Sequence, residues 1–456
     1  MYTRKEAITF SPFFWEKINP KKQKIAHLVI IGTKPDIIKQ APVILALKKT
    51  KANLIIGHTG QHFEDNLNQD AKEIFKFTPD FNLNINGSIC QKISQIIERL
   101  GNIIWELKRR KIIIVPYVHG DTTTANAAAF ACYMNTIPVV HIEAGLRSFN
   151  PKEKILKLLL KSKNPDIKKY HTLLLSPQNW EKGSVEPFPE QFNTRTVAST
   201  AALHNAPLNL NKNNLLEEGH RRDRIFVYGN TIADAVEFTL KQRNAINEKY
   251  PQLKKGFIRF TVHRRENINS RRRFKAIFDA METLVRNKEI VLWLSHNANK
   301  YAVKSFGLEG RIKKLIKKYD NFIYSDRLWT YNENIQAMRY AVVNVSDSGS
   351  EQEEANILRL PMVTIRFGSD RPETIWAGSN IVAPPISKEI ILGAIRYAIE
   401  NQKMKEAPTL YGQNVAEKII HKTEEILRRE KFFQWEHERL GLKLGNFWKQ
   451  DKIEEF

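Results

Sequence analysis

The chain has 456 residues, 42% of them hydrophobic and 27% charged, and its formal net charge at pH 7 is +23. This composition excludes an intrinsically disordered chain, and the lack of an apolar run of about 18 residues excludes a membrane-spanning segment. Two cysteines without a CxxC pair, Cys90 and Cys132, exclude a disulfide framework and a cysteine metal site.

Residues 1–23 come first and are predicted to form an appended arm, because they lack the apolar core of a secretory signal. We therefore expect a cytoplasmic protein. Short β-branched runs then alternate with helical patterns, which predicts an α/β fold with parallel sheets. The runs of the first half are IAHLVIIG, NLIIGH, KIIIVPYV, IPVVHI and YHTLLLS. Those of the second half are RIFVYG, GFIRFTV, EIVLWLS, NFIYS, AVVNVS, PMVTIR and NIVAP.

These two series are too many strands for one compact sheet, and a chain of this length is expected to hold two or three domains of about 150 residues each. We therefore predict two Rossmann-like, doubly wound parallel-sheet domains, at residues 24–222 and 223–405. A charged helical tail, residues 406–456, follows. Its Trp435 and Trp448 need burial, so we expect the tail to pack back across the domain junction.

The high positive charge suggests a nucleic acid or an anionic membrane as a partner. In RIKKLIKKY and RRRFKAIF, however, the basic residues alternate with apolar positions at helical spacing, as on solvated helix faces. No nucleic-acid-binding motif accompanies them, so we expect no nucleic-acid partner. An anionic small substrate and a weak contact with a membrane surface remain open.

Two neighbouring strand patterns run directly into acids, IIIVPYVHGD into Asp121 and VVHIEAGLR into Glu143. An acid at a strand end is often only paired with a nearby cation, which for Glu143 suggests Arg147. Two acids beyond adjacent parallel strands instead indicate a ligand site, because ligands bind beyond the carboxyl ends of such strands.

Two turns open helices directly after strands, GTKPDIIK at 32–39 and SDSGSEQEEA at 346–355. Each places free backbone N–H groups where an anion can bind, although the same residues also serve simply as helix caps. The segment TVHRREN, 261–267, suits a diphosphate clamp or proton transfer. Arg366 and Arg371 in RFGSDRPETIWAG fit ribose or phosphate contacts, and equally a salt-bridged loop.

Nine segments, in this order, closely resemble the non-hydrolysing UDP-N-acetylglucosamine 2-epimerases over roughly residues 26–400. They are GTKPDIIKQAPV, TGQH, HGDTTTANAA, HIEAGLRS, PEQFN, GNTIADA, HRREN, DSGSEQEE and DRPE. The resemblance implies two Rossmann-like domains in the glycosyltransferase B arrangement, with the active site in the interdomain cleft. It also implies UDP-GlcNAc and UDP-ManNAc as substrates, a homodimer, no metal, no cofactor, and a supply of ManNAc-type sugars for cell-surface polysaccharide.

The chemistry that the resemblance implies is elimination of UDP to 2-acetamidoglucal, followed by re-addition. The residues it implies for catalysis are Asp121, Glu143, Glu190 and His263. Those it implies for UDP-sugar binding are Lys34, Lys39, His119, Arg147, Arg264, Ser348, Gly349, Ser350, Glu354 and Arg371. A regulatory or second site is assigned to Gln61, His62 and His296.

The chain departs from the family pattern at several positions. The usual Arg and Glu of the first motif are Lys34 and Asp36, the second glycine of DSGG is Ser350, and the arginine after PEQFN moves to Arg195. Residues about 149–186 are predicted to be an insertion into the first domain. Three alternatives remain open: a hydrolysing epimerase that releases free N-acetylmannosamine, another nucleotide-sugar enzyme of this fold, and an inactive relative that acts as a binding module.

Overall fold

The computed structural model describes residues 8–428 apart from residues 13, 19–23, 61–72, 244–245, 296 and 328. Several sequence-based expectations therefore lie outside the described residues: most of the arm at 1–23, the second-site residues Gln61, His62 and His296, and Trp435 and Trp448 of the tail. Within the described residues, no helix is both long and apolar enough to cross a membrane.

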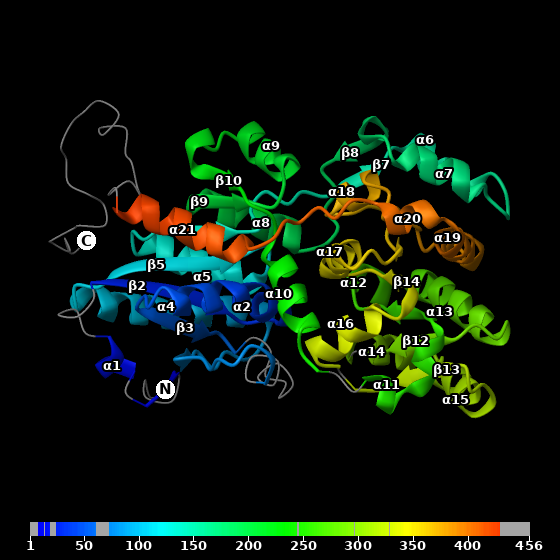
Figure 1. The fold of residues 1–456 in the computed structure, drawn as a ribbon, viewed down its shortest axis with the longest axis horizontal. Coiled ribbons are helices and arrows are strands. Elements are labelled where there is room, and N and C mark those ends of the chain that lie inside the picture. The colour runs from blue at the N-terminus through cyan, green and yellow to red at the C-terminus, as the bar shows by residue number, and fades with distance from the viewer. Residues whose placement is uncertain are drawn as a thin grey trace. The chain divides into compact units, whose positions relative to one another are not determined.

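The chain divides into two compact units. The first takes the described parts of residues 1–146, 192–235 and 412–456, and the second takes residues 147–191 and 236–411. Each is an α/β unit with its own sheet, so the predicted fold class is confirmed (Figure 1).

The first unit holds an eight-stranded sheet in the order β1-β4-β3-β2-β5-β6-β9-β10, parallel except for the β1–β4 pair. Its strands are β1 (Thr9–Phe10), β2 (Ile25–Ile31), β3 (Leu54–His58), β4 (Phe81–Asn82), β5 (Ile113–His119), β6 (Val139–Ile142), β9 (Ala201–Ala206) and β10 (Ile225–Val227). The strand order reverses at β2 and β5, so the helices after these two strands begin at the edge where a doubly wound sheet binds ligands.

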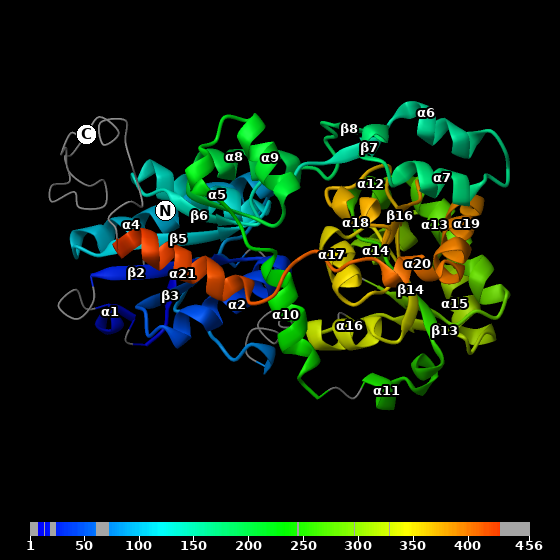
Figure 2. The same cartoon turned by 45° about the horizontal axis from the view of Figure 1, so that its top comes forward.

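The helices of this unit are α1 (Phe14–Lys17), α2 (Lys34–Lys49), α4 (Ile89–Arg109), α5 (Thr123–Met134), α9 (Asn209–Glu217) and α21 (Val415–Arg428). Two more, α8 (Glu190–Ser199) and α10 (Thr231–Leu240), each contain a point where the chain passes from one unit to the other. Helix α21 lies along α2 in both views (Figure 1, Figure 2). It is fixed there by His27–Glu424 (2.9 Å) and by two backbone amides that donate to Asp234.

The second unit holds a six-stranded parallel sheet in the order β13-β12-β11-β14-β15-β16. Its strands are β11 (Phe257–Thr261), β12 (Val291–Leu294), β13 (Phe322–Ser325), β14 (Ala341–Ser346), β15 (Met362–Thr364) and β16 (Asn380–Val382). Its core includes buried Trp293, which stacks on Phe260 and meets Phe278 edge-on. The order reverses at β11 and β14, so the helices that follow these strands begin at its ligand-binding edge.

The helices of this unit cover both faces of the sheet. They are α11 (Ile246–Lys249), α12 (Arg265–Ile268), α13 (Arg271–Arg286), α14 (Asn297–Ser305), α15 (Glu309–Lys318), α16 (Tyr331–Met338), α17 (Gly349–Ile357), α18 (Pro372–Trp376), α19 (Lys388–Glu400) and α20 (Gln402–Glu406). A separate segment adds the hairpin of β7 (Phe149–Pro151) and β8 (Trp180–Lys182), with α6 (Glu153–Leu156) and α7 (Ile167–Leu174) between them. Short 3-10 helices occupy Lys157–Leu160, Pro177–Asn179, Arg222–Arg224 and Pro251–Lys255.

The boundaries expected from sequence differ from these units. The segment expected as an insertion into the first domain belongs to the second unit, where the Phe149 and Ser369 backbones exchange two hydrogen bonds of 2.9 Å. RIFVYG was expected in the second series, but its strand β10 pairs with β9 in the first sheet. The tail also divides, since its residues 406–411 belong to the second unit and α21 to the first.

The expectation of a strand at YHTLLLS was wrong, because most of this segment is helix α7. Asp166 caps the helix by accepting a hydrogen bond from the Lys169 N–H (2.9 Å). The buried residues Ile167, Tyr170, His171 and Leu174 fall at helical spacing and form one face, and α7 packs against α19 (Figure 2).

Candidate functional site

Glu143 follows the last residue of β6 and is almost fully buried, with 2% of its surface exposed. Its φ of 62° lies in the left-handed region, which is uncommon for a residue with a Cβ and costs conformational energy. Strand β6 pairs in parallel with β5, and Ile142 lies opposite His119. The two strand ends that the sequence predicts to carry acids are therefore neighbours.

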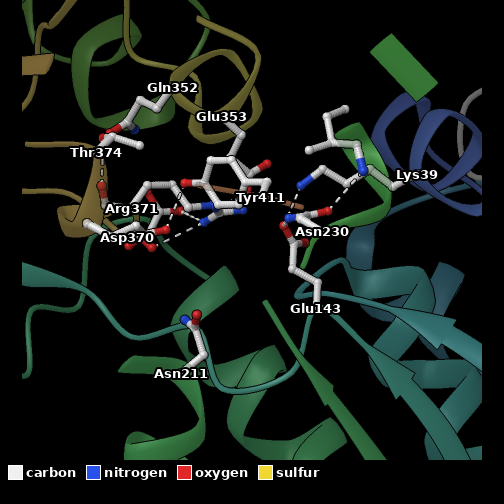
Figure 3. Close-up of polar contacts among 12 residues, drawn as sticks. Lys39, Glu143, Asn211, Asn230, Gln352, Glu353, Asp370, Arg371, Thr374 and Tyr411 are labelled. Atoms are coloured by element: carbon white, nitrogen blue, oxygen red, sulfur yellow. Dashed lines mark hydrogen bonds and ion pairs between the residues drawn. The ribbon is translucent and has the colours of Figure 1, made fainter. Parts of the chain in front are cut away.

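Three side chains from separate elements contact the Glu143 carboxylate, and Figure 3 labels two of them, Lys39 and Asn230. Lys39 of α2 forms an ion pair with Oε1, and the Asn230 amide donates to the same oxygen at 2.7 Å. His119 at the end of β5 places Nε2 3.0 Å from Oε2. The Lys39 and Glu143 side chains are each 1% exposed, so this pair interacts with almost no solvent screening.

Gly120 leaves the space that the Glu143 carboxylate occupies. Its φ is 61°, and a Cβ added there would lie 2.7 Å from Oε2 of Glu143. The backbone around it is fixed, because the Gly120 N–H donates to the Ile142 carbonyl (2.8 Å) and the His141 ring contacts the Gly120 carbonyl (2.8 Å). Only glycine combines this backbone conformation with this close approach.

Asp36 occupies the start of α2 as part of a helix cap. Its carboxylate accepts from the Thr33 N–H (2.9 Å) and from the Thr33 and Thr122 hydroxyls (2.8 and 3.0 Å). Burial raises the pKa of Asp36, while the charge of His119 opposes that rise. The capping interpretation of the GTKPD turn is therefore confirmed, and anion binding there stays a prediction. Lys34, the first residue of α2, is partly exposed.

Asp121 is partly exposed just after β5, and its backbone is anchored by the PEQFN motif. Asn193 donates from Nδ2 to the Asp121 backbone carbonyl (2.9 Å), and its Oδ1 accepts from Nδ2 of Asn126 (2.9 Å). Two motifs that lie about seventy residues apart in the chain thus meet in the first unit.

In the second unit, Asp347 holds the HRREN turn at the end of β11. Its buried carboxylate accepts from the backbone N–H groups of His263 (3.0 Å) and Arg264 (3.1 Å), and from the Asn267 amide (2.9 Å). The His263 side chain stays 35% exposed. Arg264 in turn donates to Oε1 of Glu190 at 2.5 Å, so two predicted site residues form an ion pair.

The start of α17 lies among arginines. Ser348 is its N-cap, and a Cβ added at Gly349 would lie 3.1 Å from Asp370 Oδ2, 3.5 Å from Arg371 Nη1 and 3.6 Å from Arg264 Nη2. The free N–H groups at this helix start and two guanidinium groups thus lie close together. Ser350 follows partly exposed, and Glu354, on the next turn of the helix, is buried.

The RFGSDRPE segment is a salt-bridged loop, which is one of the two interpretations that its sequence allows (Figure 3). Arg371 pairs with Glu353 (2.7 Å) and Asp370 (2.8 Å), and Arg366 pairs with Asp370 (2.6 Å). The two arginines hold the pKa of Asp370 well below its usual range despite burial. A role for Arg371 in binding UDP stays a prediction, since these donors already serve carboxylates.

The predicted site residues fall into two groups. Lys34, Lys39, His119, Asp121 and Glu143 belong to the first unit, and within it the structure joins Lys39, His119 and Glu143. The second unit holds Arg147, Glu190, His263, Arg264, Ser348, Gly349, Ser350, Glu354 and Arg371. Arg147 is buried, at 1% exposure.

Sequence reasoning missed two polar groups beside these residues. Asn230 was visible in GNTIADA as an asparagine before a helical pattern, which signals a helix cap and not a carboxylate partner. Arg259 of β11 forms a bidentate ion pair with Glu351 of α17 (2.8 and 3.1 Å), and its charge helps to lower the pKa of Glu351. No spacing in the sequence marks that pair, because the two residues meet only through the sheet.

A sequence model of the family described as UDP-N-acetylglucosamine 2-epimerase matches residues 45–157 and 182–424. The UDP-N-acetylglucosamine 2-epimerase of Neisseria meningitidis is 30% identical over 87% of this chain and 98% of its own length. That of Bacillus subtilis is also 30% identical, over 89% of this chain and 96% of its own. The crystal structure of the Methanocaldococcus jannaschii enzyme with UDP-GlcNAc and UDP covers 88% of this chain and 99% of its own, at 26% identity and a TM-score of 0.72.

Proposed function

The chain belongs to the UDP-N-acetylglucosamine 2-epimerase family, and on that basis we propose that it interconverts UDP-GlcNAc and UDP-ManNAc. The observation that carries the proposal is the buried carboxylate of Glu143, held by Lys39, Asn230 and His119 at the carboxyl edge of a parallel sheet. Buried carboxylates with charged partners at a ligand-binding edge are frequent among the groups that move protons at a bound substrate.

The reaction inverts the configuration at C2 of the sugar. No carbonyl group neighbours this carbon in a way that would make its hydrogen acidic. We propose that a base removes the C2 proton while the C1–O bond to UDP breaks, which leaves a C1=C2 double bond in 2-acetamidoglucal. A proton then returns to the opposite face of C2 as UDP re-forms its bond to C1. This sequence needs groups that give and take protons on both faces of the sugar.

Glu143 supplies one such group in this proposal. Asp121, Glu190 and His263 are the further candidates. Asp121 and His263 are both partly exposed, so a bound substrate can reach them. Glu190 is paired with Arg264 at 2.5 Å.

The nucleotide is assigned to groups of the second unit. The N–H groups at the start of α17, at Gly349 and Ser350, and the Arg264 guanidinium bind the diphosphate in this proposal. The resemblance assigns the ribose hydroxyls to Glu354. These groups also stabilise the negative charge that UDP gains as it leaves.

We also propose a cytoplasmic homodimer that supplies ManNAc-type sugars for cell-surface polysaccharide. Helices α4 and α5 pack together and expose large apolar side chains, among them Trp105 (50%) and Met134 (58%), which suits burial against a second copy. A weak contact with an anionic membrane surface is supported by exposed lysines between residues 152 and 169, beside Leu160 at 62% exposure. Light scattering after size exclusion tests the dimer.

Product analysis tests the proposed reaction. The protein is incubated with UDP-GlcNAc, and the nucleotide and sugar products are separated by ion-exchange chromatography and identified by mass and NMR. We expect an equilibrium mixture of UDP-GlcNAc and UDP-ManNAc. Free N-acetylmannosamine with UDP would instead establish the hydrolysing alternative, and no turnover together with nucleic-acid binding in moderate salt would establish the binding module.

A further inference from the structure

Both the oxygen and the nitrogen of the Asn230 side-chain amide form hydrogen bonds. Its Oδ1 accepts from the Ile232 N–H (3.1 Å) and so caps helix α10, while Nδ2 donates to Oε1 of Glu143 (2.7 Å). The residue is buried, at 2% exposure. Because an N–H must meet the carboxylate and an oxygen must meet the helix N–H, only one orientation of the amide satisfies both contacts.

The two oxygens of Glu143 have different surroundings. Oε1 receives the Lys39 ammonium and the Asn230 amide. Oε2 faces Nε2 of His119 at 3.0 Å, and both ring nitrogens of His119 are buried without a hydrogen bond among the described residues. An oxygen that already accepts from two donors, one of them cationic, is a poor site for a proton.

Resting on the proposed function, we propose that Asn230 is a positioning residue for Glu143. Together with Lys39 it reserves Oε1 as the charged, anchored oxygen, so that Oε2, on the His119 side, is the oxygen that takes and returns the proton.

The inference explains why a helix cap lies at this carboxylate. The hydrogen bond from the Ile232 N–H fixes the Asn230 side chain at the start of α10, and the same side chain orients Glu143 through Oε1. The other titratable groups around the carboxylate are Lys39 of α2 and His119 of β5, with Asp36 of α2 coupled electrically to His119. On β6 itself, the His141 ring contacts the Gly120 backbone.

Two substitutions test the inference while keeping the cap, because serine and aspartate are both good N-cap residues. Asn230→Ser removes the donor to Glu143 without adding charge. Asn230→Asp places a second carboxylate against Oε1. The matched control is Asn214→Ser, which removes another buried asparagine of the first unit, one that donates to the Gly145 carbonyl (2.9 Å).

We expect Asn230→Ser to lower kcat about ten- to a hundredfold with KM little changed, since hydrogen bonds to charged groups are among the strong ones. Asn230→Asp should also shift an apparent pKa of the kcat profile upward by about one unit or more, because like charges disfavour ionisation. Asn214→Ser should lower the melting temperature and leave the pH profile in place.

The outcomes separate the inference from the function on which it rests. If the wild-type protein has no epimerase turnover, the proposed function fails. If the wild type is active and both folded Asn230 variants keep its kcat and pH profile, the positioning role is overturned. Equal losses of kcat and melting temperature in Asn230→Ser and Asn214→Ser would also overturn it, because they would show a purely structural asparagine.

Discussion

Replacing Glu143 by glutamine keeps the shape of the side chain and removes its charge. The oxygen of the new amide can still accept from Lys39 and Asn230, and its NH₂ can face His119. What is lost is the counter-charge of an ammonium that is 1% exposed. Removing one partner of a buried ion pair costs about 3–5 kcal/mol, well above the roughly 1 kcal/mol of an exposed pair.

Glu143→Gln should therefore lower both stability and turnover, and a second substitution separates the two effects. In the double variant Glu143→Gln/Lys39→Met, the unpaired ammonium is gone, so most of the lost stability should return. Turnover should stay at least about a hundredfold below wild type in both variants, because neither has the carboxylate that moves a proton. Calorimetry measures the melting temperatures, and a chromatographic assay measures UDP-ManNAc formation.

Two results would refute this reasoning. Near wild-type turnover in folded Glu143→Gln would make Glu143 only a structural acid. A double variant that melts no higher than the single one would show that the buried Lys39–Glu143 pair does not determine stability at this position.

Three further predictions concern other positions. Gly120→Ala should reduce turnover more than about tenfold, because the added Cβ would displace the Glu143 carboxylate. The control is Gly219→Ala, where φ is also positive (88°) but an added Cβ meets nothing within 4 Å, so this variant should cost only backbone strain. Equal activity in the two variants would contradict the role of the Gly120–Glu143 contact. Burial raises the pKa of Glu373 to about 7, so the folded state holds a proton that the unfolded chain releases near 4.5, and stability falls as pH rises between these values. Glu373→Gln should then melt higher than wild type above pH 7 and lose that advantage toward pH 5, and an advantage that is constant with pH would contradict it. Lys34→Arg should keep turnover within about tenfold, since the charge remains and one altered phosphate contact is worth about 1.4 kcal/mol or less; a loss of several orders of magnitude would give the ammonium a specific role.

Strands that are buried on both faces were readable from the sequence, because parallel sheets select continuous β-branched runs such as those of β2, β5 and β14. Strand β9 was missed, since AALHNA has no β-branched residue, and it is extended because β6 and β10 pair with it on either side. Helix α7 was misread because its short apolar run fits a buried strand equally well.

The candidate site could be predicted only in part, because its contacts join residues that lie far apart in the sequence. An acid directly after a strand marked Glu143, and its proximity in sequence suggested Arg147 as the cation. The structure shows an ion pair with Lys39, 104 residues away, and an amide donor in Asn230, 87 residues away, neither of which sequence proximity suggested. The side chain that reaches a carboxylate depends on the order of the strands in the sheet and on where the following helices begin. The spacing of residues along the chain shows neither.

Proton NMR of the reaction in deuterated water tests the central claim most directly, because it follows the C2 hydrogen on which every proposed role depends. If the enzyme removes and returns that proton, UDP-ManNAc should appear with deuterium at C2, and deuterium should enter the C2 position of the remaining UDP-GlcNAc as the reaction reverses. UDP-ManNAc that keeps its original C2 hydrogen, or the absence of both product and exchange, would contradict the account.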